Sequence, residues 1–113
     1  WPNVKREVYI DFRPMGLNPD GAVFDAAGLF WCAHWGAGCI AAYDAGGKQV
    51  ARHEVPARHS SCPAFGGPDF TTLYCTSARK GLDDAALSAE PTNGQTFALA
   101  GVAKGRAEYR VIL

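Results

Sequence analysis

The chain has 113 residues, and its 11 basic and 11 acidic side chains give a formal net charge of zero. A neutral chain lacks the basic surface that nucleic acids and anionic membranes attract, which excludes both classes of partner. The length fits one domain, and a hydrophobic fraction of 48% is enough for a packed core. The 13 glycines and 7 prolines fall between short apolar runs, a pattern typical of many strands joined by tight turns.

The first residues read as a strand followed by a loop. Residues 4–12 alternate apolar and polar side chains and predict a strand, whereas residues 13–19 contain two prolines and a glycine and predict a loop. The chain does not begin with methionine, so we expect it to start inside a larger structure. No signal-peptide pattern is visible, and we expect a cytoplasmic protein.

The next residues predict a meander of four antiparallel strands. We expect these strands over residues 22–25, 29–33, 39–43 and 48–55, with glycine-rich turns between them. The last strand is the most polar and should lie outermost. The apolar stretch at 22–43 is long enough to suggest a membrane span, but Asp25, His34 and several glycines interrupt it and favour strands.

A second unit of similar composition follows. We expect strands over residues 62–65, 73–77, 95–100 and 108–113. A long connection separates the second and third of these strands, and its part 82–90 has a helical composition that Pro91 ends. No C-x-x-C pair occurs, so we expect free thiols, with a disulfide as the alternative, at Cys32, Cys39, Cys62 and Cys75.

The two units repeat at a fixed spacing. Trp31-Cys32 is followed about 43 residues later by Tyr74-Cys75, in each case on a strand after a glycine-containing turn. A period of about 40–50 residues with four strands per unit is the signature of a β-propeller blade. A closed propeller needs about four to eight blades, and this chain holds about two.

These patterns predict an all-β fold, a partial β-propeller of about two four-stranded antiparallel blades. Residues 1–113 would form the C-terminal portion of one propeller domain. Residues 1–17 would carry the last strand of a preceding blade, 18–56 a complete blade, and 57–113 a blade with a long helical insertion. Two blades alone leave apolar faces and sheet edges open. We therefore expect the missing N-terminal blades or another chain as partner, with a self-contained sandwich or barrel as the alternative.

Asp20 is the main candidate for a functional residue. It lies in the sequence Asn-Pro-Asp-Gly at the start of a predicted strand, where a carboxylate is well placed to bind a metal. Pro-Asp-Gly is also a common type I turn, so the pattern alone leaves a purely structural role open. Asp69 lies in a similar Gly-Pro-Asp turn, and we expect it to be only a turn residue.

Two longer stretches carry a family resemblance. PDGAVFDAAGLFWCAHWGAGCIAAYD at 19–44 and CPAFGGPDFTTLYCTSAR at 62–79 resemble the C-terminal part of the senescence marker protein/gluconolactonase/regucalcin family. The similarity covers about residues 8–113. It implies a six-bladed propeller of which this chain is a C-terminal piece, inactive alone, and an activity as a metal-dependent hydrolase of sugar lactones.

The resemblance also implies a divalent cation at the top of the central channel. The family binds it with a glutamate, two asparagines and the aspartate of Pro-Asp-Gly, and only the aspartate maps here, onto Asp20. The implied metals are Ca²⁺, Zn²⁺, Mg²⁺ or Mn²⁺, and the harder of these cations prefer oxygen ligands. In that role Asp20 binds the metal and also accepts a proton from the water that attacks the lactone.

His34 and Trp35 are candidates for the substrate pocket. We expect them after a strand end, on the same rim as Asp20, where an imidazole or an aromatic ring suits a sugar lactone. His59, in the loop that enters the second unit, is expected to be part of a polar turn, with substrate contact as the alternative. A different functional class also stays open, because a regucalcin-like propeller that binds calcium without catalysis would share these residues.

Overall fold

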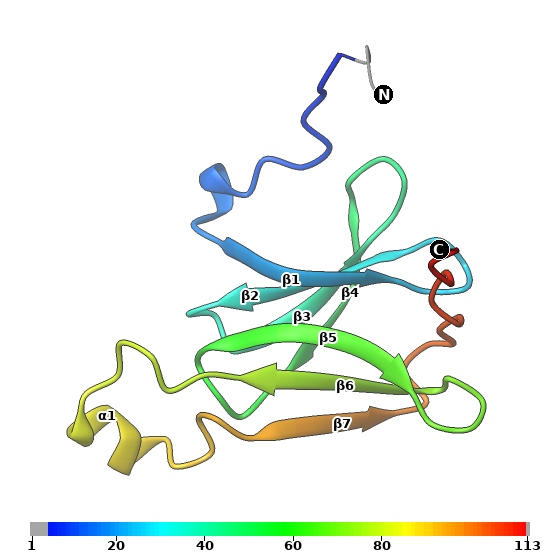
Figure 1. Ribbon diagram of the computed structural model, residues 1–113. Helices are drawn as coiled ribbons and strands as arrows, with labels where there is room; N and C mark the ends of the chain where they lie inside the picture. Colours follow the sequence, from blue (N-terminus) through cyan, green and yellow to red (C-terminus); the bar gives the residue numbers. More distant parts are fainter. Residues whose placement is uncertain (1–4, 113) are drawn as a thin grey trace.

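Two stacked antiparallel β-sheets make up the fold of the computed structural model, which describes residues 5–112 (Figure 1). The first sheet has the order β1-β2-β3-β4 and the second the order β5-β6-β7, so each sheet follows the sequence. The seven strands are β1 (Asn18–Phe24), β2 (Phe30–Trp35), β3 (Cys39–Tyr43), β4 (Gln49–Glu54), β5 (Ser60–Gly66), β6 (Thr72–Ser77) and β7 (Thr96–Ala100). Two short helices, η1 (Arg13–Met15) and α1 (Asp84–Ala89), lie outside the sheets. The predicted all-β fold and the helix within 82–90 are confirmed.

The first strands of the two sheets lie side by side. β1 packs along β5, and the later strands of each sheet extend away from this pair (Figure 1). Both strands begin at the same end of the molecule, where β2 and β6 end and α1 lies. The residues that β1 and β5 present at this end are therefore close together.

The main core fills the space between the sheets. β2 and β3 are apolar on both faces, and all five residues of β3 are buried. Fully or nearly fully buried side chains from both sheets form this core, among them Trp31, Ala33, Ile40, Ala42, Leu73 and Cys75. A smaller cluster lies on the opposite face of the first sheet and joins Phe12 to Cys32, Ala41 and Tyr43.

The N-terminal segment covers that opposite face and is not a strand. The prediction of a strand over 4–12 is wrong for residues 5–12, and residue 4 lies outside the described residues. The Phe12 ring packs edge-on against Tyr43 and His34, with centroids 5.2 Å and 4.9 Å apart. Alternating side chains need a partner strand to form a ladder, and here the apolar side chains cover the sheet face instead.

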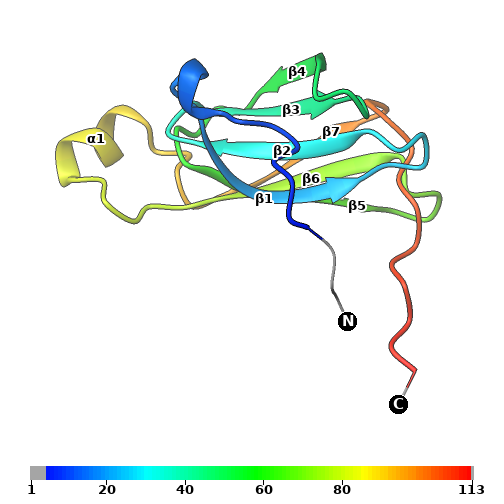
Figure 2. The ribbon, with the colours of Figure 1, turned by 90° about the horizontal axis from the view of Figure 1, so that it is seen from above.

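The C-terminal segment also differs from its prediction. Residues 108–112 form no strand, and residue 113 lies outside the described residues, so the second sheet has three strands where we expected four. Figure 2 shows the N-terminal segment and the C-terminal tail leaving the stacked sheets on the same side. The tail is solvated, with Tyr109 81% and Ile112 96% exposed.

The cysteines are free thiols, as predicted. Cys32, Cys39 and Cys75 are buried, whereas Cys62 is exposed on β5. Burial raises the pKa of both Cys32 and Cys75 to about 11, so these thiols stay protonated and behave as small apolar side chains. Within residues 5–112, no helix has the length and hydropathy to cross a membrane.

Candidate functional site

Asp20 lies in a β-bulge on β1. The pairing of β1 with β2 is regular from Ala22 onward but shifts in register between Pro19 and Ala22. A bulge leaves residues out of the ladder and turns their side chains to new directions. Asp20 is exposed, so its carboxylate is open to a ligand. The sequence predicted a turn before the strand, whereas β1 already begins at Asn18 and carries Asp20 within it.

Gly21 brings this bulge into direct contact with β5. A Cβ atom at residue 21 would lie 2.8 Å from the Cα and Sγ atoms of Cys62 and 2.8 Å from the carbonyl oxygen of Ser61. The pairing of β5 with β6 has its own register shift between Ser60 and Cys62. The two neighbouring strands therefore carry bulges at the same level, and Asp20 lies where they meet.

Hydroxyl groups surround this junction on the β5 side. The Ser61 and Thr76 hydroxyls lie 2.8 Å apart and share a hydrogen bond. The Ser60 hydroxyl is fully buried and lies within hydrogen-bond distance of two carbonyl oxygens, 3.1 Å from that of His34 and 2.9 Å from that of Cys39. Ser60 therefore ties the start of β5 to the β2–β3 turn, a role that the sequence pattern did not indicate.

His34 lies within β2 and not in a loop. It is 0% exposed, its Nε2 atom is 2.7 Å from the Tyr43 hydroxyl, and its ring packs against Phe12. Burial and the positive charge of Arg52 lower the pKa of His34, so the imidazole is neutral at physiological pH. The structure places it under the N-terminal segment, on the face of the first sheet away from the second sheet.

Trp35 is the half-buried neighbour of His34 at the end of β2. Its ring stacks on His59 with centroids 4.2 Å apart and planes 16° apart. Trp35 pairs with Asn18 across the β1–β2 ladder, two residues from Asp20. The structure therefore brings Asp20, Trp35 and His59 to the same end of the sheets. His59 lies in a turn, as expected, and is almost fully buried.

The described residues do not form a complete metal site. Within residues 5–112, no group of three or more histidine, cysteine, aspartate or glutamate side chains is placed to hold an ion. Asp20 offers one carboxylate, and a hard cation takes six or more oxygen ligands. Asp20 can therefore supply one ligand of a larger metal site but does not form a metal site on its own.

A separate cavity lies at this end of the molecule. It has a volume of about 490 Å³ and lies between the turn at 36–38, the loop at 55–58 and the chain at 89–92. Arg58 and Glu90 line it and form an ion pair 2.6 Å long. Because its charged groups are already paired and no unpaired polar side chain lines it, this cavity has no evident chemical role.

Asp25 is a buried carboxylate with a structural role. It is 2% exposed and accepts hydrogen bonds from the backbone amides of Ala27 and Leu29 and from the indole nitrogen of Trp31, each 2.9 Å long. Hydrogen-bond donors offset the cost of removing a buried carboxylate from water. Asp25 therefore fixes the β1–β2 turn and the position of Trp31 in the core.

Comparison with known proteins agrees with this architecture. Residues 3–79 match the family model described as the SMP-30/Gluconolactonase/LRE-like region. The putative sugar lactone lactonase of Rhizobium meliloti is 52% identical over 89 residues, which are 79% of this chain and 30% of that protein. Pentonolactonase XacC of Haloferax volcanii is 40% identical over 109 residues, which are 93% of this chain and 38% of that protein.

A solved structure shows the same fold. The crystal structure of a calcium-binding protein, regucalcin, from Agrobacterium tumefaciens superposes with a TM-score of 0.90 at 47% identity, over 97% of this chain and 38% of that chain. The two stacked sheets are thus blades of a partial propeller, as predicted. The chain spans about a third of the length of these relatives. Its motifs, its fold and the family model agree, and the chain belongs to the SMP-30/gluconolactonase/LRE-like family.

Proposed function

We propose that this chain is the C-terminal part of a metal-dependent hydrolase that opens sugar lactones. Two of its relatives are named for lactone hydrolysis, at 52% and 40% identity. Because the chain spans about a third of their length, the activity is proposed for the full-length protein, with the remaining blades as the necessary partner. The four free cysteines support a reducing, cytoplasmic location.

The observation that carries this proposal is the position of Asp20. Its exposed carboxylate lies on a bulge of β1, directly beside the bulge of β5. In a propeller the first strands of the blades surround the central channel, so Asp20 would face the same space as the first strands of the missing blades. A metal ligand needs that location, whereas a turn residue does not.

In the proposed reaction Asp20 would accept a proton and bind the metal ion. In lactone hydrolysis the oxygen of water bonds to the carbonyl carbon, the ring C–O bond breaks, and a proton of the water ends on the former ring oxygen. Asp20 would accept that proton as the water attacks and hold it until the ring oxygen takes it. A divalent cation, Ca²⁺, Zn²⁺, Mg²⁺ or Mn²⁺, supplies Lewis-acid polarisation of the carbonyl when bound. Asp20 would provide one of its ligands.

Of the two pocket candidates, Trp35 has the geometry for contact with substrate. Its ring is half-buried and held flat against His59, at the same end of the sheets as Asp20. A fixed aromatic face packs well against the apolar face of a sugar ring. His34 is fully buried on the opposite face of β2 with Tyr43 and Phe12, so its proposed role is to hold the N-terminal segment on the first sheet and not to contact substrate.

A full-length chimera tests the proposal. We would replace the matching part of the Agrobacterium tumefaciens regucalcin with this chain and measure metal-dependent hydrolysis of gluconolactone. Asp20→Asn should lower kcat/KM by about 100-fold or more, the usual contribution of a proton-transferring group. The matched control is Asp69→Asn, because Asp69 is an exposed aspartate that caps a turn through Thr71, and it should change kcat/KM by less than about twofold.

A second candidate function is calcium binding without catalysis. It is favoured by the solved relative, which is described as a calcium-binding protein. A chimera that binds Ca²⁺ through Asp20 but hydrolyses neither sugar lactones nor simple esters would establish this role. Equal lactonase activity in the Asp20→Asn and unsubstituted chimeras would rule out the catalytic role of Asp20.

A further inference from the structure

Ser61 on β5 holds the position that Asp20 holds on β1. The first strand of each sheet pairs with a buried cysteine of the second strand: Ala22 pairs with Cys32, and Pro63 pairs with Cys75. Asp20 and Ser61 each lie two residues before this pairing, within the register shift of their own strand. Because the two sheets repeat one unit, equivalent residues take equivalent places in them. Ser61 is therefore the counterpart of Asp20 in the second blade.

The two residues are also neighbours across the junction of the sheets. A Cβ atom at residue 21, directly after Asp20, would lie 2.8 Å from the carbonyl oxygen of Ser61. Asp20 is exposed and Ser61 is half-buried, so solvent reaches both residues. A ligand as large as a sugar ring can therefore contact both side chains at once.

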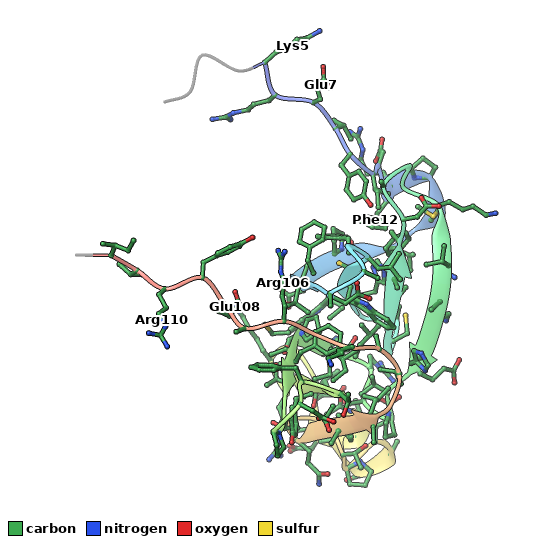
Figure 3. The ribbon with its side chains drawn as sticks, turned by 90° about the vertical axis from the view of Figure 1, so that its right-hand side faces the viewer. Lys5, Glu7, Phe12, Arg106, Glu108 and Arg110 are labelled. Carbon is green, nitrogen blue, oxygen red and sulfur yellow. The ribbon has the colours of Figure 1, made fainter. Side chains whose placement is uncertain are left out.

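The C-terminal tail does not cover Ser61. Ser61 lies near the start of β5, at the end of the molecule where β1 also starts (Figure 1). The tail crosses the opposite end, where the carbonyl of Lys104 accepts a 2.8 Å hydrogen bond from the amide of Ala26, just beyond the end of β1. Figure 3 shows Arg106 and Arg110 in a tail that extends away from the sheets. The surface around Ser61 is thus open to a ligand on this side.

The hydrogen bonds around Ser61 leave its oxygen free to accept. The Ser61 and Thr76 hydroxyl oxygens lie 2.8 Å apart, and the Thr76 hydroxyl donates to the carbonyl of Cys62 at 3.4 Å. A hydroxyl group has one hydrogen to donate and two lone pairs that accept. Because the single hydrogen of Thr76 goes to the carbonyl, Ser61 has to donate to Thr76. The Ser61 oxygen then keeps its lone pairs for a donor from outside the sheet.

A free acceptor beside a carboxylate suits a ligand that carries several hydroxyl groups. Each ring hydroxyl of a sugar lactone can donate one hydrogen bond, and the Ser61 oxygen can accept one without adding charge beside Asp20. We propose that Ser61 determines specificity by accepting a hydrogen bond from a ring hydroxyl of the substrate. This inference rests on the proposed function in taking a sugar lactone as the ligand. It adds the residue that distinguishes a hydroxylated lactone from an unsubstituted one.

Binding of gluconolactam to the full-length chimera tests the inference, because this ring keeps the sugar hydroxyls and its amide resists hydrolysis. Ser61→Ala should weaken binding about three- to tenfold in isothermal titration calorimetry, the usual effect of one lost hydrogen bond. Ser61→Thr keeps the hydroxyl and should bind within about twofold of the unsubstituted chimera. The matched control is Ser88→Ala, because Ser88 is an exposed serine on α1, and it should leave the affinity unchanged.

Kinetics give a second measurement of specificity. Ser61→Ala should lower kcat/KM for gluconolactone about three- to tenfold and leave kcat/KM for δ-valerolactone, which has no hydroxyl groups, unchanged. The affinity of the chimera for Ca²⁺ should also stay the same, since the proposed partner of Ser61 is the sugar and not the metal. A brace between β5 and β6 alone would not discriminate between the two lactones.

The outcomes separate this inference from the proposed function. Weaker gluconolactam binding by Ser61→Ala, restored by Ser61→Thr, supports the inference. Equal binding by Ser61→Ala and the unsubstituted chimera overturns it, and so does a loss of Ca²⁺ affinity that accounts for the weaker sugar binding. No gluconolactam binding by the unsubstituted chimera overturns it as well. Ser61-dependent binding without hydrolysis of gluconolactone would reject the lactonase function alone, whereas hydrolysis that Ser61→Ala leaves unchanged would reject this inference alone.

Discussion

At the level of single residues, the structure separates side chains that face solvent from those that organise the core. Asp20 lies within β1 and Asp25 directly after it, yet Asp20 is exposed on a bulge and Asp25 is buried with three hydrogen-bond donors. His34 is buried in a similar way, between Phe12 and Tyr43. The uncharged state of His34 has a measurable consequence.

His34 should make the fold sensitive to acid. Burial lowers its pKa in the folded state below the ordinary value of 6.5, so near and below pH 6.5 the unfolded chain binds more protons than the folded chain. The free energy of unfolding therefore falls as the pH drops below about 6.5, by up to about 1.4 kcal/mol per pH unit from this one group. His34→Gln removes this contribution.

Urea unfolding at several pH values between 8 and 5, in about equal steps, measures the effect. The variant should lose less stability than the unsubstituted protein on acidification, whatever its stability at pH 8. If the two curves of free energy against pH ran parallel, the imidazole of His34 would have to be protonated in the folded state, contrary to its burial.

How far single residues could be predicted from sequence depended on local signals. The Pro-Asp-Gly pattern selected Asp20, and family resemblance gave it a role that the pattern alone left open. The sequence did not show that His34 faces the N-terminal segment. The predicted strand ended two residues before the end of β2, so His34 was placed in a loop. Only its position within the strand determines the sheet face on which its side chain lies. It also gave no signal for the buried hydroxyl of Ser60, whose acceptors are on other strands.

At the level of secondary-structure elements, the contact of β1 with β5 sets the site. Two bulged strands approach each other at Gly21, where only a hydrogen atom fits against the backbone of Ser61 and Cys62. This contact joins the two blades and places Asp20 at their junction. The absence of a side chain at residue 21 therefore links the stability of the fold to the geometry of the site.

Gly21→Ala should weaken that junction. The added Cβ would lie 2.8 Å from the Cα of Cys62 and from the carbonyl oxygen of Ser61, and backbone atoms cannot move aside as a flexible side chain does. We expect a loss of about 1–3 kcal/mol in the free energy of unfolding, the usual cost of overpacking. In the chimera, the same substitution should also lower kcat/KM, because it shifts the strand that carries Asp20.

Gly46→Ala is the matched control for this substitution. A Cβ at residue 46 would lie 3.3 Å from the side-chain oxygen of Asp44, which needs to shift by only a few tenths of an ångström and can keep its hydrogen bonds to the amides of Gly46 and Lys48. We therefore expect a loss of less than about 1 kcal/mol. Urea unfolding of both variants measures the difference. Equal stability of the two variants would mean that β1 and β5 do not touch at Gly21.

The elements themselves were predicted with uneven success. The strands inside each meander were confirmed within a few residues, because apolar runs between glycine-rich turns are a local signal. The two terminal strands, over 4–12 and 108–113, were wrong for the described residues because a strand exists only beside a partner. No such partner for these segments lies within residues 5–112, and their alternating side chains alone do not make a strand.

At the level of the whole molecule, the two sheets leave apolar side chains exposed on their outer faces. The outer face of the second sheet exposes Tyr74, Ala98 and Ala100, and the first sheet exposes 46% of Phe24 beside Phe30. The sequence predicted that apolar faces would stay open, and these exposed side chains agree with that prediction. In the proposed function, the remaining metal ligands and the substrate pocket would come from residues outside these 113, so this sequence could not predict them.

We expect the 113-residue chain to bind a metal ion more weakly than the full-length chimera does. Within residues 5–112 Asp20 has no further carboxylate or imidazole beside it that would complete a site, so a cation bound there would keep most of its water shell. The 113-residue chain alone should bind Ca²⁺ with a Kd of about 1 mM or weaker, the range of sites with few protein ligands. The full-length chimera, in which other blades add ligands, should bind at least about tenfold more tightly.

Isothermal titration calorimetry with Ca²⁺ alone distinguishes these cases, and Asp20→Asn provides the control in both proteins. In the chimera the substitution should remove most of the binding, since a missing carboxylate lowers both the number of ligands and the negative charge of the site. In the isolated chain it should change little, because one exposed carboxylate holds a hydrated cation only weakly. Tight binding by the isolated chain, abolished by Asp20→Asn, would instead mean that two blades are enough to form the metal site.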